Sequence, residues 1–254
     1  MGIGPNKTTE IKKDSGRLED YKVRLIETLL QSGALQLGVY DLKNERKSPY
    51  YVDIGKLHSG FDTAVLVEAY AKAISQIPDM EKSEINVYGI PEKGVAFVAA
   101  VSMVLANEYG LNVDWSFTRK VPKDRGEATN ARQDDPKSNI VGAIPGPGTE
   151  VVMLDDVFTS GKTKVEELEK LAALEIVPTS IVIVVDRQEI GADGKNAVEE
   201  FTRATGIPVY PILKITDIIQ YLSERTEYLK QYRRMSEYLL QYGTAEALAT
   251  LVRF

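Results

Sequence analysis

The chain has 254 residues, with 31 Lys+Arg, 37 Asp+Glu and one His, which gives a formal charge of −6 at pH 7. This length fits one large α/β domain or two small ones, and the absence of cysteine excludes disulfides, cysteine-ligated metals and thiol nucleophiles, while His58 alone cannot form a multi-histidine metal site. The acidic balance argues against nucleic-acid binding, and no apolar run is long enough to predict a membrane span.

The chain begins with a polar segment and a predicted helix. Residues 1–16 lack the apolar stretch of a signal peptide, and we expect them to form a disordered tail. Between residues 18 and 29, apolar side chains recur at helical spacing, and Gly33 is a plausible end for that helix.

The middle of the chain alternates between strand-like and helical patterns. Because alternation of this kind is typical of right-handed βαβ units, we expect an α/β fold with a mostly parallel sheet covered on both faces. The segment from about 216 to 254 is rich in Tyr and Leu, and it predicts two or three further helices, packed on the sheet or on a partner. The expected strands are 85–90, 113–118, 151–154, 181–185 and 209–213, and the expected helices are near 95–109, 164–174 and 197–205.

The pattern stops between residues 118 and 151. This stretch begins with four cations in seven residues, Arg119, Lys120, Lys123 and Arg125, and is then polar up to a cluster of Pro and Gly. A long loop inside a compact domain is usually a functional lid or a disordered segment. A solvated run of charges would be the structural alternative.

The segment 151–163 carries the strongest chemical signal. An apolar strand ends in Asp155 and Asp156, and a turn containing hydroxyl groups and Gly161 leads into a helix. Free backbone N–H groups at such a turn suit a phosphate, and carboxylates accept hydrogen bonds from sugar hydroxyls or hold the water shell of Mg²⁺. The Gly161–Thr163 sequence imitates the end of a Walker A loop, but Asp156 stands where that motif needs glycine.

These residues resemble the 5-phosphoribosyl-1-diphosphate (PRPP) motif of type I phosphoribosyltransferases. Three further segments resemble those of orotate phosphoribosyltransferases: the substrate segment 42–55, the cationic loop 119–127 and the Asp-Arg-Gln-Glu sequence 186–189. The similarity runs from about residue 18 to residue 238. It implies one phosphoribosyltransferase domain over 17–254, with a small N-terminal hood, a flexible catalytic loop and a C-terminal helical extension.

The resemblance assigns roles to individual positions. Asp155 and Asp156 would bind the ribose hydroxyls, and Tyr51, Val52, Thr159 and Arg187 would contact orotate, with Arg187 on its carboxylate. The residues implied in PRPP binding are Lys43, Lys93, Arg119, Lys120, Lys123, Arg125, Asp155, Asp156, Val157, Phe158, Thr159, Ser160, Gly161, Lys162 and Thr163; those implied in catalysis are Lys93, Arg119, Lys123, Arg125, Asp155 and Asp156.

The implied function is Mg²⁺-dependent transfer of the phosphoribosyl group from PRPP to orotate. The products would be orotidine 5′-monophosphate and pyrophosphate, in pyrimidine biosynthesis. The implied enzyme is a cytoplasmic glycosyltransferase and a homodimer with shared active sites. Its Mg²⁺ would be held mainly by PRPP and water, with no protein residue assigned as a direct ligand. We expect no nucleic-acid or membrane partner.

The sequence departs from the family pattern at several positions. Arg125 stands where many relatives carry His, Glu92 stands where others have Tyr, Lys162 is bulky for a phosphate turn, and the loop after Glu127 is longer. The alternatives are a phosphoribosyltransferase for another nucleobase and a non-catalytic PRPP- or nucleotide-binding regulator. An interaction scaffold would leave the 155–163 segment unexplained.

Overall fold

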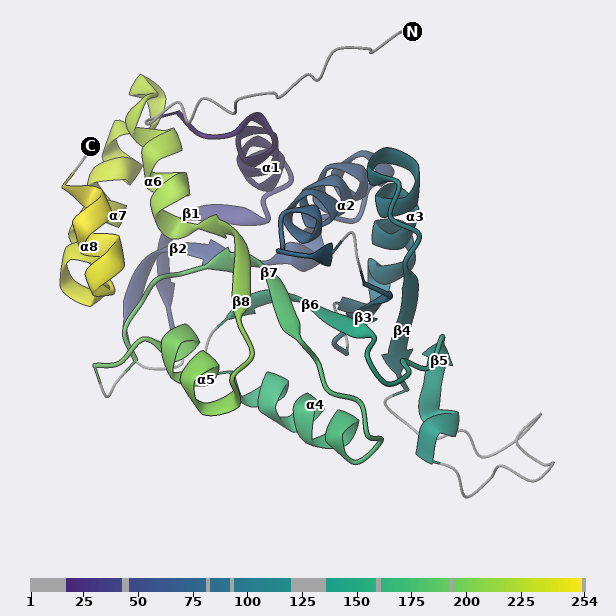
Figure 1. Cartoon of the computed structure of the whole chain (residues 1–254). Helices are drawn as coiled ribbons and strands as arrows, with labels where there is room; N and C mark the ends of the chain where they lie inside the picture. The colour runs from purple at the N-terminus through teal and green to yellow at the C-terminus, as the bar shows by residue number, and fades with distance from the viewer. Residues whose placement is uncertain are drawn as a thin grey trace, which may run out of the picture.

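A six-stranded sheet forms the centre of the molecule (Figure 1). The computed structural model describes residues 17–42, 46–80, 83–91, 94–119, 136–158, 161–191 and 194–252. The strand order is β5-β4-β3-β6-β7-β8, and every neighbouring pair is parallel except β4–β5. The predicted α/β fold with a mostly parallel sheet is therefore confirmed. The strands are β3 (Ile85–Gly89), β4 (Asp114–Thr118), β5 (Ile140–Gly142), β6 (Glu150–Phe158), β7 (Ser180–Asp186) and β8 (Val209–Lys214).

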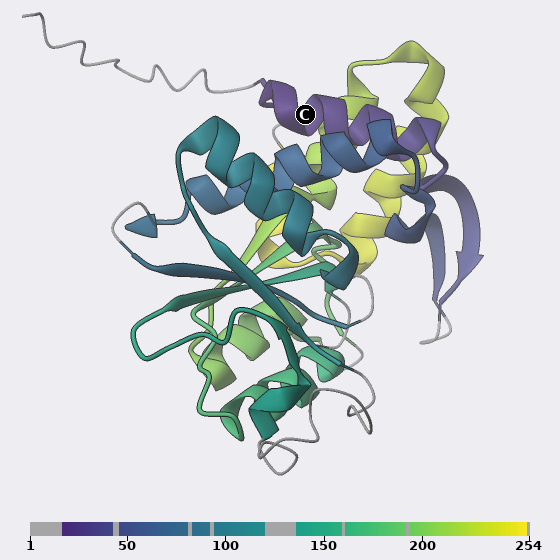
Figure 2. The same cartoon turned by 90° about the vertical axis from the view of Figure 1, so that its right-hand side faces the viewer.

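Helices cover both faces of this sheet (Figures 1 and 2). Successive residues of a strand point to opposite faces, so Val152 and Leu154 of β6 join one hydrophobic cluster while Val151 and Met153 join the other. The first cluster lies under α1 (Asp20–Gln31), α2 (Gly60–Ser75), α3 (Val98–Tyr109) and α6 (Ile215–Ser223). The second lies under α4 (Lys162–Ala172) and α5 (Ala197–Thr205).

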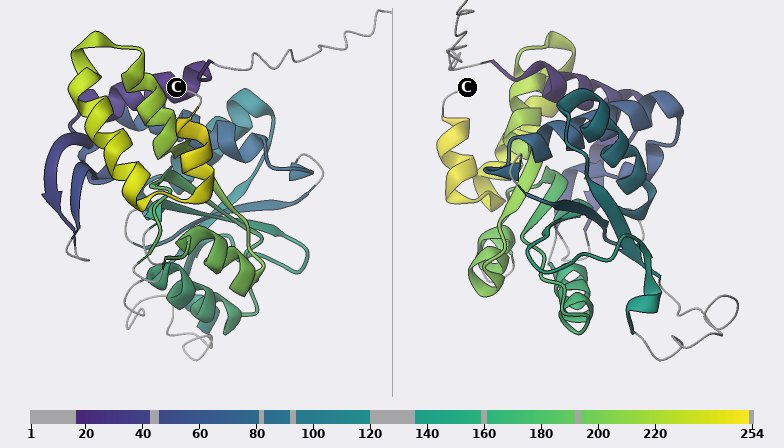
Figure 3. Two further views of the ribbon diagram at one scale, coloured as in Figure 1. Left: turned by 90° about the vertical axis from the view of Figure 1, so that its left-hand side faces the viewer. Right: turned by 45° about the vertical axis from the view of Figure 1, so that its right-hand side comes forward.

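A separate hairpin and the C-terminal helices flank the sheet. The hairpin pairs β1 (Leu35–Asp41) with β2 (Lys47–Val52) in antiparallel register. Beside it lies α7 (Leu229–Tyr242), and α8 (Ala245–Leu251) packs against α7 and α6 (Figure 3). The prediction of two or three helices from residue 216 onward is confirmed, and they pack on their own chain. None of the helices in the described ranges is long and apolar enough to cross a membrane.

Several boundaries predicted from the sequence differ from the structure. β6 does not end before the carboxylates but continues to Phe158, because Asp155 and Val157 pair with Ile183 and Val185 of β7. The stretch between 118 and 151 is not wholly without regular structure, since β5 pairs with β4 there. Finally, α1 begins at Asp20 rather than at residue 18. The expected tail 1–16 lies outside the described residues.

Candidate active site

The two carboxylates of the predicted PRPP motif lie near the C-terminal end of β6. Asp155 is buried and Asp156 is half-buried. The N–H of Asp156 donates to Oδ1 of Asp155 at 2.8 Å, and the N–H of Val157 donates to Oδ1 of Asp156 at 2.7 Å. Each carboxylate is thus oriented by the backbone that follows it. In an open parallel sheet, ligands bind at this edge, beyond the carboxyl ends of the strands.

Lys164 is a member of this site that the sequence analysis missed. Its Nζ donates to Oδ2 of Asp155 at 2.5 Å and to the carbonyl of Val157 at 3.3 Å, and it lies 4.8 Å from the ring centroid of Phe158. Its side chain is only 4% exposed. Burial raises the pKa of Asp155 above its ordinary value, and the charge of Lys164 acts in the opposite direction. Its position directly after the motif was the only sequence signal for this role. Lysines are rarely fully buried unless they are paired, and the sequence alone does not identify Asp155 as the partner.

Gly161 lies immediately before α4, three residues after the end of β6. Gly161 caps the helix with a φ of +70°, in the left-handed region that favours glycine. A Cβ at this position would lie 2.9 Å from Cζ of Phe158. The backbone of α4 therefore starts directly beside the end of β6, and its N-terminal N–H groups suit a phosphate. Thr159 and Ser160 lie outside the described residues, as do the side chains of Lys162 and Thr163.

The turn after β3 lies against the same end of β6. The N–H of Ile90 donates to the carbonyl of Leu154 at 3.1 Å. A Cβ on Gly94 would lie 2.3 Å from that carbonyl oxygen, so only glycine allows this approach. Lys93, the predicted pyrophosphate-binding lysine, lies outside the described residues. Its neighbour Gly94 nevertheless fixes the turn next to the Asp155–Asp156 pair.

The cationic segment begins where β4 ends. Arg119 donates its N–H to the carbonyl of Asn139 at 2.9 Å. Just before it, Thr118 donates to buried Glu167 of α4 at 2.8 Å, and Tyr88 of β3 also hydrogen-bonds that carboxylate. The base of the segment is therefore tied to the helix that follows the PRPP motif. Lys120, Lys123 and Arg125 lie outside the described residues, as does Lys43 of the hairpin.

Arg187 follows β7 and belongs to a buried polar cluster. Its Nε and Nη2 donate to Oε1 of Glu189 at 3.0 and 2.7 Å, and Nη2 also donates to Oγ of Ser48 at 3.1 Å. The guanidinium lies over the ring of Tyr50, 4.3 Å from its centroid. The Arg187 and Glu189 side chains are 12% and 11% exposed. Sequence reasoning found Arg187 but missed Tyr50 and Glu189.

Tyr51 and Val52, the predicted orotate contacts, lie on opposite faces of β2. Val52 is buried, whereas Tyr51 is 43% exposed and its ring centroid lies 5.7 Å from that of Tyr40. Neighbouring strand residues alternate in this way. Tyr50, rather than Tyr51, supplies the aromatic ring against Arg187.

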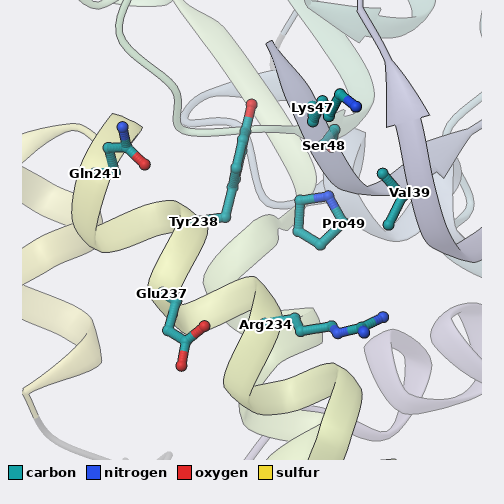
Figure 4. Close-up of a pocket in the computed structure, with 8 residues that line it drawn as sticks. All are labelled: Val39, Lys47, Ser48, Pro49, Arg234, Glu237, Tyr238 and Gln241. Carbon is teal, nitrogen blue, oxygen red and sulfur yellow. The ribbon is translucent and has the colours of Figure 1, made fainter.

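Two surface pockets flank these elements. One, of about 360 Å³, lies between the hairpin and α7 (Figure 4), and the other, of about 330 Å³, includes exposed His58. Neither is lined by Asp155, Asp156 or Arg187. We therefore define the candidate site by the motif residues at the sheet edge rather than by the pockets. In the described part of the chain, no three acidic or histidine residues gather as metal ligands.

Fold and site together define a type I phosphoribosyltransferase, with a carboxylate pair at the end of the central strand and a glycine turn beside it. No family model matches the chain. It is 31% identical over 229 residues to an orotate phosphoribosyltransferase of Marinobacter nauticus, covering 89% of this chain and all of the relative. It is 32% identical over 228 residues to that of Methylococcus capsulatus, covering 90% of this chain and all of the relative. The chain belongs to the orotate phosphoribosyltransferase family.

A solved structure agrees with this assignment. The orotate phosphoribosyltransferase of Francisella tularensis superposes with a TM-score of 0.72 at 28% identity, covering 87% of this chain and all of that one. The enzyme from Aeropyrum pernix, at 21% identity and a TM-score of 0.54, shares the fold.

Proposed function

We propose that the edge formed by β3, β6 and β7 binds PRPP against Asp155 and Asp156 and orotate against Arg187. Family membership makes the chain an orotate phosphoribosyltransferase, which forms orotidine 5′-monophosphate and pyrophosphate in pyrimidine biosynthesis. One observation supports this placement: the Asp155–Asp156 pair and Arg187 lie near the C-terminal ends of two adjacent parallel strands, β6 and β7, in which Phe158 pairs with Asp186. Two halves of one ligand site are expected at such neighbouring strand ends.

The reaction breaks the bond between ribose C1 and pyrophosphate and forms a bond from C1 to the orotate nitrogen. Positive charge develops on the ribose and negative charge on the leaving group. Asp155 and Asp156 hold the ribose hydroxyls, and the turn 159–163 holds the 5′-phosphate. Lys93, Arg119, Lys120, Lys123 and Arg125 stabilise the departing pyrophosphate. Because orotate is already a conjugated acid, orientation and electrostatics supply most of the catalysis.

The described side chains suit Mg²⁺ that is held mainly by the substrate. The site offers two adjacent carboxylates, and one of them, Asp155, already accepts a bond from Lys164 at 2.5 Å. Mg²⁺ requires six oxygen ligands and keeps several waters. Most ligands would therefore come from PRPP oxygens and water, with Asp156 acting on that water shell. The ion would supply charge neutralisation on the pyrophosphate.

A dimer is supported by the surface of α3. This helix is apolar on nearly every side, yet Ala99, Met103 and Ala106 face solvent, and Met103 is 58% exposed. Phe61 in the first turn of α2 is 89% exposed. A helix that is apolar all round is normally buried. A second copy of the chain covering this face would explain the pattern.

The dimer is tested by sedimentation velocity. We expect Met103→Glu to yield monomers, whereas Val177→Glu, at a 72% exposed site, should keep the association state of the wild type.

The activity is tested by incubating the purified chain with PRPP, Mg²⁺ and a panel of bases while pyrophosphate release is followed. Release with orotate, and much less with uracil, hypoxanthine or adenine, is the expected result. Release with another base alone would assign a different substrate. PRPP binding without release for any base would indicate a regulator.

A further inference from the structure

The carboxylate of Glu189 connects the Arg187 side of the site to the C-terminal helix. It accepts bonds from Arg187, from the hydroxyl of Tyr50 at 2.7 Å and from the hydroxyl of Tyr238 at 3.1 Å. These partners come from the loop after β7, from the hairpin and from α7. Tyr50 and Tyr238 also meet edge to face, with ring centroids 6.3 Å apart and planes at 89°. Figure 4 shows Tyr238 rising from α7 beside Ser48 and Pro49 of β2.

The backbone of the same loop is bonded to the end of α7. Glu189 and Gly243 form an antiparallel β-bridge. On either side of it, the N–H of Ile190 donates to the carbonyl of Tyr242 at 2.8 Å, and the N–H of Thr244 donates to the carbonyl of Gln188 at 2.8 Å. The segment that carries Arg187 is thus paired with residues 242–244 over three consecutive positions.

A second arginine, on the hairpin, contacts both α7 and the loop after β7. Arg46 lies over the ring of Tyr242, 4.5 Å from its centroid. Its Nη1 and Nη2 donate to the carbonyls of Ile190 and Gly191 at 2.7 and 3.1 Å. The hairpin, the loop after β7 and α7 are therefore fastened to one another on both sides of Glu189.

We propose that Glu189, held by Tyr238 and by the bridge to Gly243, is the positioning residue that orients Arg187 toward the carboxylate of orotate. The C-terminal helix α7 then supports the base subsite as well as the fold. This inference rests on the proposed function. Its geometric basis is that Oε1 of Glu189 accepts from both Nε and Nη2 of Arg187, while Tyr238 donates to Oε2 of Glu189 and also interacts with Arg187. A carboxylate that approaches Arg187 therefore meets a guanidinium whose plane is already fixed.

Preorganisation explains why such a support affects binding. A free arginine side chain must lose rotamer freedom when it grips a ligand, whereas one already fixed loses little. Tyr238 keeps the Glu189 carboxylate in place without adding charge. Loss of the Tyr238–Glu189 hydrogen bond should therefore reduce the affinity for orotate and leave the PRPP half of the site intact.

Tyr238→Phe tests this with a matched control, Tyr221→Phe. The Tyr221 hydroxyl donates to Glu27 at 3.1 Å, the same distance as in the Tyr238–Glu189 bond, but on α6 away from Arg187. Steady-state kinetics are measured with orotate and PRPP varied in turn. Arg187→Ala is the reference for complete loss of the proposed contact with the orotate carboxylate. We expect Tyr238→Phe to raise KM for orotate about three- to tenfold, the value of one hydrogen bond. KM for PRPP should stay within about twofold, as should both constants in the control.

Turnover of uracil, which lacks the carboxylate, separates positioning from general damage. Tyr238→Phe should lower the preference for orotate over uracil by the same factor. Equal rises in both KM values, or an unchanged KM for orotate, would overturn the positioning role. A wild-type chain inactive with orotate would instead refute the proposed function, and this inference with it. Thermal unfolding of both Phe variants shows whether either has lost its fold.

Discussion

Nζ of Lys164 lies 2.5 Å from Oδ2 of Asp155, and both side chains are almost completely buried. The pair joins the first turn of α4 to the end of β6. Removing one partner from a buried ion pair leaves an uncompensated charge in an apolar environment. Lys164 therefore favours the charged form of Asp155 against the effect of burial and orients this carboxylate at the place where the ribose hydroxyls are expected.

Lys164→Met should destabilise the chain strongly. We expect a loss of about 3–5 kcal/mol in the free energy of unfolding at neutral pH, as for other broken buried pairs. Arg203→Met is the control, because Arg203 pairs with Glu200 on α5 at 3.0 Å and the two side chains are 76% and 34% exposed. That change should cost less than about 1 kcal/mol. Urea unfolding of the two variants measures both values, and equal losses would contradict the assignment.

The same variant should show a defined pH dependence. Burial already raises the pKa of Asp155 in the folded chain, and loss of Lys164 removes a cause that lowers it. The folded chain then holds the Asp155 proton at a pH where the unfolded chain has released it. Acidification should therefore shrink the stability deficit of Lys164→Met, and rising pH through the folded-state pKa should enlarge it. A deficit independent of pH would show that Asp155 is not the affected group.

Gly94→Ala should damage the turn that carries Lys93. The new Cβ would lie 2.3 Å from the Leu154 carbonyl oxygen, so either the turn or β6 must shift. We expect kcat to fall at least about tenfold, since small displacements of catalytic groups have large effects. The control is Gly60→Ala, where nothing lies within 4 Å of the added Cβ. Pyrophosphate release and circular dichroism separate lost chemistry from lost fold.

Much of the fold could be predicted because the sheet is buried on both faces. Strands such as β7 are continuous apolar runs, and β6 carries its carboxylates at one end. The hairpin was missed because Gly38 and Pro49 interrupt its strands. The helix α2 was also missed, although the sequence carried a signal for it: Ser59 caps the helix by accepting from the N–H of Asp62 at 3.1 Å.

The polar contacts of the site were harder to predict than its motifs. Glu189 and Tyr238 are 49 residues apart, and nothing local indicates that they meet. Lys164 lies two residues after Lys162, which the sequence analysis described as bulky for a phosphate turn. Charged residues on a helix are normally solvated, so only the packing of α4 against β6 identifies Lys164 as buried.

His58→Asn should retain most activity. His58 is exposed and lines a pocket that contains neither Asp155 nor Arg187. With Arg125 in the cationic loop, no loop histidine titrates near neutral pH. The pH profile of kcat/KM should therefore be the same for the variant and the wild type. Loss of nearly all turnover with PRPP binding intact would place His58 in the chemistry.

Shared active sites would be revealed by mixing two inactive variants. Lys123→Ala alters the cationic loop, and Asp156→Asn alters the end of β6, so each homodimer should be nearly inactive. If the loop acts on the partner's site, a hybrid dimer has one site with both defects and one with none. Activity should then recover toward half that of the wild type for each hybrid dimer.

The opposite outcome is equally clear. If the loop serves its own chain, every site in the hybrid keeps one defect and mixing restores nothing. Native mass spectrometry must confirm that hybrids form, and Met103→Glu placed in both chains should abolish recovery by preventing association. Recovery that survives Met103→Glu would show that the exposed face of α3 is not the surface that brings the two copies together. Absence of recovery in confirmed hybrids would leave a subunit whose site is complete in itself.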